Sequence, residues 1–389
     1  MVLENPYPPD ERVENEINIL TKNGFRITLV CKGDTGRVQE EENGNLTIIR
    51  IPVSKFVYKS GAIALILPIY FRFWYNHLSR IIRQSKFEAI HLHDLPLVKM
   101  GIKLSEKFNL PLISDYHENR PEIMKMYRHT QTFPGKFIIS IKRWWRYQKK
   151  YTPRVDCLIL VTEEARDYYI NNYGVSSHKI TVLPNYISLE RFRKFETNNV
   201  PESELINRFT IVYFGDTGFR RGTLTILESA EILKNSDIHF LIIGSSREHH
   251  LLQKTADDLQ LQNVTFTGWI PINEAIKLIN ISKVGLCPFL RNVHHDTTYA
   301  NKMFQYMALG KPVVVSNCTA QANFVTKEAC GLVFEAANSQ ELSHQIIRLT
   351  DQSEYYRFSK NAKSCVFDKY NWEISGSKLI DLYTSLKKE

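Results

Sequence analysis

Apolar runs separated by helix-length stretches constrain the fold of this chain more than any other feature. Five strand-like runs occupy residues 25–31, 46–51, 89–93, 112–115 and 157–161. After a polar stretch at 197–204 the alternation restarts, with six further runs at 209–214, 238–243, 264–267, 284–288, 312–315 and 331–334. Strands separated by helices form parallel sheets that are covered on both faces. The sequence therefore predicts the α/β class, with two Rossmann-like, doubly wound parallel-sheet domains facing a central cleft, the usual ligand position in such folds.

At 389 residues the chain has the length of two domains, each able to bury a core of its own. We assign residues 1–192 to the first domain, 193–370 to the second and 371–389 to a final helix. Neither half contains a G-x-G-x-x-G fingerprint or a G-x-x-x-x-G-K-[ST] loop. Their absence from the sequence argues against a dinucleotide-dependent oxidoreductase and a P-loop ATPase.

The positive charge of the chain lies in its first half. Residues 1–200 carry a net charge of +9 and residues 201–389 carry none. This asymmetry predicts an anionic partner for the first half, with nucleic acid, acidic lipid and a phosphorylated acceptor as candidates.

Six scattered cysteines without a C-x-x-C pair indicate thiols in a reducing compartment. We expect a cytoplasmic protein, because the sequence shows no signal peptide and no apolar run of the roughly 20 residues that cross a bilayer.

The stretch from Tyr299 to Val315 predicts a polar loop, a short helix that Gly310 and Pro312 terminate, and then a buried strand. A helix that begins at a ligand site directs free backbone N–H groups and partial positive charge towards it, commonly towards a phosphate. Gln305, one turn into this helix, is placed to reach hydroxyl groups. On its own, Gln305 would be interpreted as an ordinary helix residue.

A second candidate phosphate site lies between Phe214 and Gly222, where a strand ends in glycines and the pair Arg220 and Arg221. Glycine lets a phosphate approach the backbone, and arginine offers paired donors to its oxygens. The alternative is an ordinary βα turn with solvated arginines.

In the first half, two strand ends carry polar residues: His91, His93 and Asp94 at one, and Asp115, His117 and Glu118 at the other. These could line a cleft, bind zinc through His91, His93 and His117, or simply hold loops.

The run NKMFQYMALGKPVVV from Asn301 to Val315 resembles the "NKLFEYMALGKPVV"-like segment of the retaining family 4 glycosyltransferases. The segment from Asn5 to Glu16 likewise resembles the family's "NPYPPD.RV..E" element and leaves only residues 1–4 for its first strand. The resemblance implies a GT-B fold and transfer of a sugar, with retention, from a nucleotide-diphosphate sugar to a hydroxyl of a glycan or lipid-linked acceptor. It also implies surface polysaccharide or glycolipid synthesis, catalysis that requires no metal or other cofactor, and a last helix that crosses back to the first, acceptor-side domain.

The resemblance also implies roles for individual residues. His117, Arg220 and Arg221 would act at the reacting centre, and Asp94 and Glu118 on the acceptor side. The residues implied in donor binding are Gly215, Thr217, Gly218, Gly268, Trp269, Asp296, Thr297, Thr298, Tyr299, Asn301, Lys302 and Gln305.

Three positions depart from the family's pattern. Asp216 stands where a frequent arginine follows the first glycine, and Thr297 and Gln305 replace a pair of glutamates. We expect the replacement at Gln305 to weaken ribose binding by about 1–2 kcal/mol. These departures leave a non-catalytic sugar-nucleotide-binding protein as one alternative; a nucleotide-sugar epimerase of the same fold is another.

The segment Phe133–Arg154 is basic and aromatic. At a helical period its aromatic and apolar side chains gather on one side, and its lysines and arginines on the other. Such a helix suits the anionic inner face of a membrane, which would make the protein peripheral. It suits equally a helix docked on its own domain with a solvated basic face. We expect no nucleic-acid partner, because the sequence has no RRM-, KH- or OB-like pattern.

Overall fold

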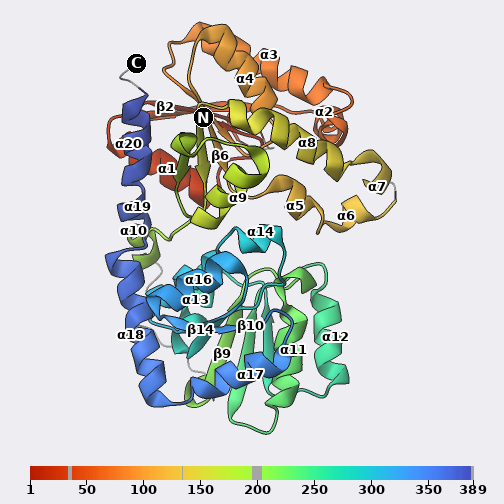
Figure 1. Ribbon diagram of the computed structural model, residues 1–389, viewed down its shortest axis with the longest axis vertical. Helices are drawn as coiled ribbons and strands as arrows, with labels where there is room; N and C mark the ends of the chain where they lie inside the picture. The colour runs from red at the N-terminus through yellow and green to blue at the C-terminus, as the bar shows by residue number, and fades with distance from the viewer. Residues whose placement is uncertain (34–36, 134, 195–203, 387–389) are drawn as a thin grey trace. The chain divides into compact units, whose positions relative to one another are not determined.

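The computed structural model describes residues 1–33, 37–133, 135–194 and 204–386. The chain forms two compact units (Figure 1). Unit 1 comprises Met1–Pro184 and Ser375–Glu389, and unit 2 comprises Asn185–Ile374. The first boundary therefore precedes the expected one at 192, because Ile187, Leu189 and Phe192 pack into the core of unit 2.

The sheet of unit 1 has the strand order β3-β4-β2-β1-β5-β6-β7-β8 and is parallel except where β3 pairs with β4. Its strands are β1 (Val2–Leu3), β2 (Ile27–Lys32), β3 (Glu40–Asn43), β4 (Leu46–Ile51), β5 (Ile90–His93), β6 (Leu112–Tyr116), β7 (Cys157–Leu160) and β8 (Ile180–Val182). The five predicted runs form β2, β4, β5, β6 and β7, whereas β3 and β8 were not predicted. The first strand is short, but it lies inside the sheet, where Val2 pairs with both Val30 and Leu92.

The helices of unit 1 connect these strands. They are α1 (Glu11–Lys22), α2 (Lys55–Ser60), α3 (Ile69–Gln84), α4 (Val98–Phe108), α5 (Arg120–Met124), α6 (Arg128–Gln131), α7 (Gly135–Ile138), α8 (Ile141–Tyr151), α9 (Glu163–Tyr173) and α20 (Ser377–Ser385). Helix α1 begins where Asp10 caps it by accepting a hydrogen bond from the backbone N–H of Val13. Its buried face consists of Val13, Ile17 and Leu20.

The amphipathic helix predicted around residues 141–151 exists as α8, and its apolar side is covered by unit 1 itself. Trp144 is 3% exposed and Tyr147 is 6% exposed. The phenol of Tyr147 donates to the carbonyl of Pro96 and accepts from the N–H of Lys99. The structure therefore supports the docked-helix alternative for α8, with Lys142, Arg143, Arg146, Lys149 and Lys150 exposed. Among the described residues, no helix combines the length and the apolar content that a membrane span requires.

Unit 2 is built on a fully parallel sheet of order β11-β10-β9-β12-β13-β14. Its strands are β9 (Phe209–Phe214), β10 (Ile238–Ile243), β11 (Val264–Gly268), β12 (Val284–Cys287), β13 (Val313–Ser316) and β14 (Gly331–Phe334). All six runs predicted for the second half form these strands. Alternate residues serve opposite faces: Val212 and Leu241 join one core cluster, and Ile211 and Phe240 join the other.

The helices of unit 2 cover both faces of its sheet. They are α10 (Leu189–Arg193), α11 (Thr223–Ile232), α12 (His249–Asp258), α13 (Ile272–Ile281), α14 (Val293–Asp296), α15 (Asn301–Ala308), α16 (Thr319–Glu328), α17 (Ser339–Arg348), α18 (Gln352–Asp368) and α19 (Trp372–Ser375). Helices α13, α15 and α16 contribute to one cluster, and α11, α12 and α17 to the other.

The C-terminal segment returns to unit 1, as the resemblance implied. Helix α20 buries Leu379 completely, and the hydroxyl of Tyr383 lies 2.7 Å from Nδ1 of His91 in β5. The final helix expected over residues 371–389 is divided into α19, at the end of unit 2, and α20, and its residues 387–389 lie outside the described residues.

Candidate functional site

The loop from Phe214 to Gly222, here called the glycine-arginine loop, connects β9 to α11 in unit 2. Its backbone takes positive φ angles at Gly215 (124°) and Gly222 (77°). A Cβ atom at Gly222 would lie 1.7 Å from the carbonyl oxygen of Pro288, so only glycine fits there. Arg220 and Arg221 occupy a single 3₁₀ turn of this loop, directly before α11. Among the residues that the structure describes, no side chain caps the N-terminus of α11, which leaves its backbone N–H groups available to a ligand.

Asp216 is the counter-ion of both arginines. Its Oδ2 lies 2.7 Å from Nη2 of Arg220 and 3.8 Å from Nε of Arg221. Burial by itself would raise the pKa of Asp216. The hydrogen bond from the N–H of Gly218 and the charges of the two arginines have the larger effect, so the pKa is lower than usual. Nη1 of Arg220 is buried and has no hydrogen-bond partner among the described residues. A buried guanidinium nitrogen without a hydrogen bond lowers the stability of the fold, and an anion that accepts its hydrogen bond would remove this cost.

Lys302 brings a third cation to this loop from the first turn of α15. Its Nζ lies 3.7 Å from the ring centroid of Tyr213 and 3.1 Å from the position that a Cβ on Gly215 would take. Burial lowers the pKa of Lys302 to about 7, and Arg221 contributes in the same direction. The described residues provide no hydrogen-bond acceptor for this amine. An anion beside Gly215 would therefore stabilise its charged form.

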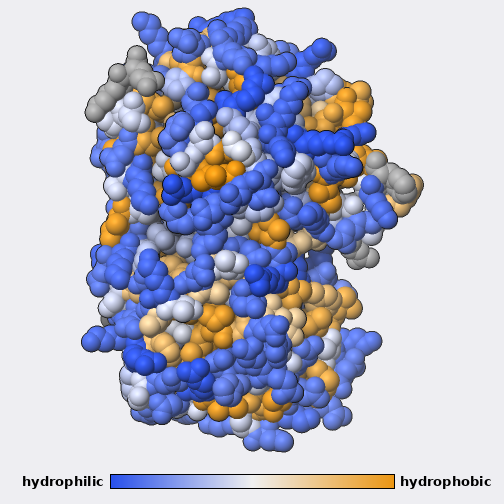
Figure 2. Space-filling model, in the orientation of Figure 1, coloured by the Kyte–Doolittle hydropathy of each residue, from blue (hydrophilic) through white to orange (hydrophobic). Residues whose placement is uncertain are grey.

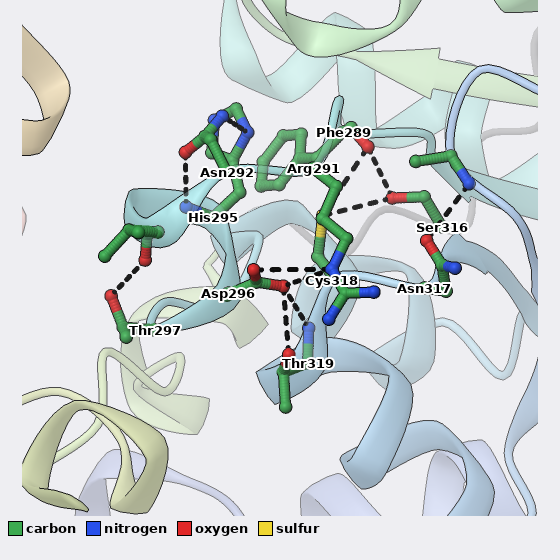
Figure 3. A network of polar contacts seen from close by, with 12 residues as sticks. Phe289, Arg291, Asn292, His295, Asp296, Thr297, Ser316, Asn317, Cys318 and Thr319 are labelled. Carbon is green, nitrogen blue, oxygen red and sulfur yellow. Dashed lines mark hydrogen bonds and ion pairs between the residues drawn. The ribbon is translucent and has the colours of Figure 1, made fainter. Parts of the chain in front are cut away.

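The loop that precedes α15 is held by its own side chains (Figure 3). Asp296 accepts hydrogen bonds from the backbone N–H and the hydroxyl of Thr319, at 2.8 and 2.9 Å, and pairs with Arg291. The hydroxyls of Thr297 and Thr298 donate to the carbonyls of Val293 and His294, both in α14. The resemblance places all three residues at the donor. The hydroxyls of Thr297 and Thr298 bond to α14, and Asp296 bonds to Thr319 at the start of α16.

The remaining predicted donor residues divide into two groups. Thr217 and Gly218 lie in the glycine-arginine loop, where the Thr217 hydroxyl donates to Ser246 at 3.1 Å. Outside that loop, Gly268 ends β11 with a φ of 66°, the neighbouring Trp269 is 77% exposed, and Tyr299 packs among the rings of Tyr186, Phe304 and Phe324. In α15, Asn301 is exposed and Gln305 is half-buried. No side chain caps the N-terminus of this helix.

In unit 1, Asp115 at the end of β6 is the centre of a buried network. Arg12 donates to its two carboxylate oxygens, from Nε to Oδ2 and from Nη2 to Oδ1, both at 2.7 Å. His117 Nε2 lies 2.8 Å from Oδ2, and His93 Nδ1 lies 3.4 Å from it. Burial lowers the pKa of His117, but Asp115 and Asp94 outweigh this effect and raise it to about 9. His117 therefore carries a positive charge at neutral pH.

The same network bears on the zinc hypothesis. The ligand atoms of Glu16, His91, His93 and Asp115 lie within 4.8 Å of one another. The guanidinium of Arg12, however, is 3.2 Å from Glu16 and 2.7 Å from Asp115, so it already supplies a cation to both carboxyl groups. This arrangement does not fit a zinc ion. Sequence reasoning missed Arg12 and Glu16, although their i, i+4 spacing on the buried face of α1 was visible.

A cavity of about 580 Å³ opens in unit 1 at the carboxyl ends of β1 and β5. It brings together Asp94 and Glu118, both predicted on the acceptor side, with His93. Its wall also contains Glu4, Arg120 and Trp144, which the sequence did not single out for this role. Asp94 holds a left-handed backbone conformation with φ of 65°, which turns the chain sharply after β5. We call this space the unit 1 cavity.

Comparison with known families divides the chain in the same way as its units. A family model described as Glycosyltransferase Family 4 matches residues 12–191, and one described as Glycosyl transferases group 1 matches residues 208–352. An Escherichia coli relative, UDP-Gal:alpha-D-GlcNAc-diphosphoundecaprenol alpha-1,3-galactosyltransferase, is 20% identical over 95% of this chain and 92% of its own length. The putative colanic acid biosynthesis glycosyl transferase WcaI of E. coli K12 is 24% identical over 40% of this chain and 39% of its own.

Solved structures of similar fold cover nearly the whole chain. Sucrose-phosphate synthase from Thermosynechococcus elongatus has a TM-score of 0.74 at 18% identity, and the match covers 99% of this chain and 94% of that one. Anabaena HepE in complex with UDP-glucose has a TM-score of 0.70 at 12% identity, with 99% and 98% covered. At these identities the likeness shows the fold.

Proposed function

This chain is a GT-B glycosyltransferase of the family 4 type, and we propose that it moves a sugar from a nucleotide-diphosphate sugar to a hydroxyl of a lipid-linked or glycan acceptor. The E. coli galactosyltransferase named above acts on a diphosphoundecaprenol-linked sugar, and its match over nearly the whole chain supports an acceptor of this kind. The complexes of HepE with UDP and UDP-glucose support a nucleotide-sugar donor. The match to WcaI supports a role in surface polysaccharide synthesis.

The cation cluster around the glycine-arginine loop carries this proposal. As the bond between the sugar C1 and the diphosphate oxygen breaks, negative charge collects on the leaving diphosphate. Arg220, Arg221 and Lys302, with the uncapped starts of α11 and α15, would stabilise it. Each charge-assisted hydrogen bond contributes about 1.5–3 kcal/mol. We propose that these groups do the work without a metal ion, and that the anomeric configuration is retained.

A thermal-shift experiment tests the donor site. Purified protein is heated with UDP, GDP, ADP, CDP or dTDP in the presence of EDTA, and we expect one nucleotide to raise the Tm. Arg220→Ala should abolish the shift, whereas Arg357→Ala on the exposed side of α18 should preserve it. A flat response to every nucleotide would contradict the proposed donor site.

An activity assay separates transfer from the two alternatives. The nucleotide sugar selected above is incubated with and without a lipid extract, and nucleotide release is measured. Release that depends on the extract supports transfer. Isomerisation of the sugar without release would support an epimerase, and binding without either reaction would support a non-catalytic sugar-nucleotide-binding protein.

We further propose that unit 1 contacts an anionic membrane surface, through a different region from the buried face of α8. Large apolar side chains are exposed around α2 and the start of α3, and Phe133 is 83% exposed. The exposed residues around α2 and α3, here called the α2 patch, are Phe56, Tyr58, Ile66, Leu67 and Ile69. Hydrophobic surface gathers over α2 beside strongly hydrophilic residues (Figure 2). Apolar residues beside Lys55 and Lys59 suit the headgroup region of an anionic bilayer.

A further inference from the structure

We propose that Glu4 binds a hydroxyl of the acceptor sugar in the unit 1 cavity, and so determines which acceptors the enzyme takes. Glu4 follows β1 directly, so its position at the edge of the sheet is set by the pairing of Val2 with its two neighbouring strands. The inference rests on the proposed transfer function, because it names the group that the cavity would hold for that reaction.

The lining of the cavity combines carboxyl groups with aromatic rings. Glu4, Asp94 and Glu118 line it together with Tyr70, Phe71 and Trp144. A carboxylate can accept hydrogen bonds from adjacent hydroxyls, and ring faces pack against the C–H groups of a sugar. His93 lines the same space, is 1% exposed, and its Nε2 has no hydrogen-bond partner among the described residues.

The charges of the lining decide which part of a lipid-linked acceptor enters. Three carboxyl groups face two cations, Lys59 and Arg120. Arg120 is also engaged with the ring of Trp144, with its guanidinium carbon 4.9 Å from the ring centroid. When Glu4 is ionised, a diphosphate would meet a predominance of like charge here, whereas an uncharged sugar would not. The cavity therefore suits the sugar of the acceptor, and its phosphates lie outside.

Protonation of Glu4 links acceptor binding to pH. Burial raises the pKa of Glu4 to about 7, while Arg120 and a hydrogen bond with Tyr70 oppose the rise and Asp94 adds to it. The other titratable groups that line the cavity are Glu118, Lys59, His93, Tyr58 and Tyr127. Burial lowers the pKa of His93, which keeps its ring neutral as Glu4 titrates. Glu4 therefore changes charge between pH 6 and pH 8.

Calorimetric titration with octyl glycosides of glucose, galactose and N-acetylglucosamine tests the proposal. At least one glycoside should bind the wild type about tenfold more tightly at pH 8 than at pH 6, in proportion to the ionised fraction of a group with a pKa of about 7. Glu4→Gln should bind it about tenfold more weakly at pH 8 and lose the pH dependence. Glu4→Asp should restore part of both, and Glu106→Gln, on the exposed face of α4, should match the wild type.

Two outcomes would overturn the proposal: no glycoside binds the wild type, or Glu4→Gln retains both affinity and pH dependence. The nucleotide-induced rise in Tm is measured on the same variants. If that rise persists in Glu4→Gln, the variant is folded and its donor site is intact, so a negative glycoside result counts against Glu4 alone. If the wild type shows no rise with any nucleotide, the proposed function fails instead.

Discussion

At the scale of single residues, two of the three cations at the glycine-arginine loop share one internal anion. Asp216 pairs with Arg220 at 2.7 Å and approaches Arg221 at 3.8 Å, whereas the Nζ of Lys302 lies 3.7 Å from the ring centroid of Tyr213. The residue that departs from the family's pattern thus holds the two arginines in the loop, and an incoming diphosphate has to compete with it.

Replacing the internal anion should strengthen nucleotide binding. In Asp216→Asn the amide oxygen can still accept from the N–H of Gly218, a bond of 2.9 Å in the wild type, while the charge that neutralises the arginines is lost. We expect the nucleotide Kd, measured by calorimetry, to fall by about threefold to tenfold, in line with about 1 kcal/mol for a partly exposed ion pair. Asp237→Asn, at an exposed site, is the control. Weaker binding would show that Asp216 mainly orients the arginines.

The buried amine of Lys302 should make donor binding depend on pH. Its pKa is lowered to about 7, so the free protein carries this charge at pH 6 and has largely lost it at pH 8. The diphosphate of a nucleotide sugar is a diester and keeps its charge over this interval. We therefore expect affinity for the nucleotide sugar to rise as pH falls from 8 to 6, and Lys302→Met to remove the dependence. An unchanged pH profile in this variant would contradict the role of Lys302.

At the scale of elements, the helical period of residues 141–151 was sufficient to predict an amphipathic helix but not what covers its apolar side. A cavity-lining tryptophan and a tyrosine bonded to the loop before α4 show that unit 1 provides the cover. A group of exposed apolar residues lies instead in the α2 patch. Periodicity defines a face, but the partner of that face depends on the packing of elements distant in sequence.

The α2 patch should bind lipid. Phe56→Ser with Leu67→Ser removes two exposed apolar side chains, so the fraction of protein that cosediments with phosphatidylglycerol vesicles should fall several-fold while the Tm is preserved. Ile347→Ser, an exposed position on α17, is the matched control. Cosedimentation equal to that of the wild type would exclude the α2 patch as the contact. If cosedimentation is lost in the double variant Lys149→Glu, Lys150→Glu instead, the basic face of α8 is the membrane contact.

At the scale of the whole molecule, the chain passes between its units twice, at Pro184–Asn185 and Ile374–Ser375. The last helix belongs to the core of unit 1, although nearly two hundred residues separate it from the rest of that unit. Its hydroxyl contact with His91 reaches the strand that leads to His93 and Asp94 in the cavity. The C-terminal helix thus supports the strand that leads to His93 and Asp94 in the unit 1 cavity.

Loss of packing in α20 should destabilise unit 1. Leu379 is completely buried, so Leu379→Ala should lower the free energy of unfolding by about 2–5 kcal/mol through lost burial and an unfilled space. Urea unfolding followed by fluorescence measures the change. Leu251→Ala, at a largely exposed position on α12, should change it by less than about 0.5 kcal/mol. A small effect at Leu379 would show that α20 is dispensable for unit 1.

The sequence by itself determined the α/β class, most of the strands, the glycine-arginine loop and the start of α15, because these depend on short-range periodicity and on turns that only glycine can make. Only the tertiary structure decided that Arg12 and Glu16 join Asp115, that Glu4 meets Asp94, Glu118 and Arg120 in one cavity, and that Asp296 bonds to Thr319 of α16. Those relations join residues that the backbone carries together from different strands and helices. Burial, which shifts the pKa values of Glu4 and Lys302 towards neutrality, likewise exists only after the chain has packed.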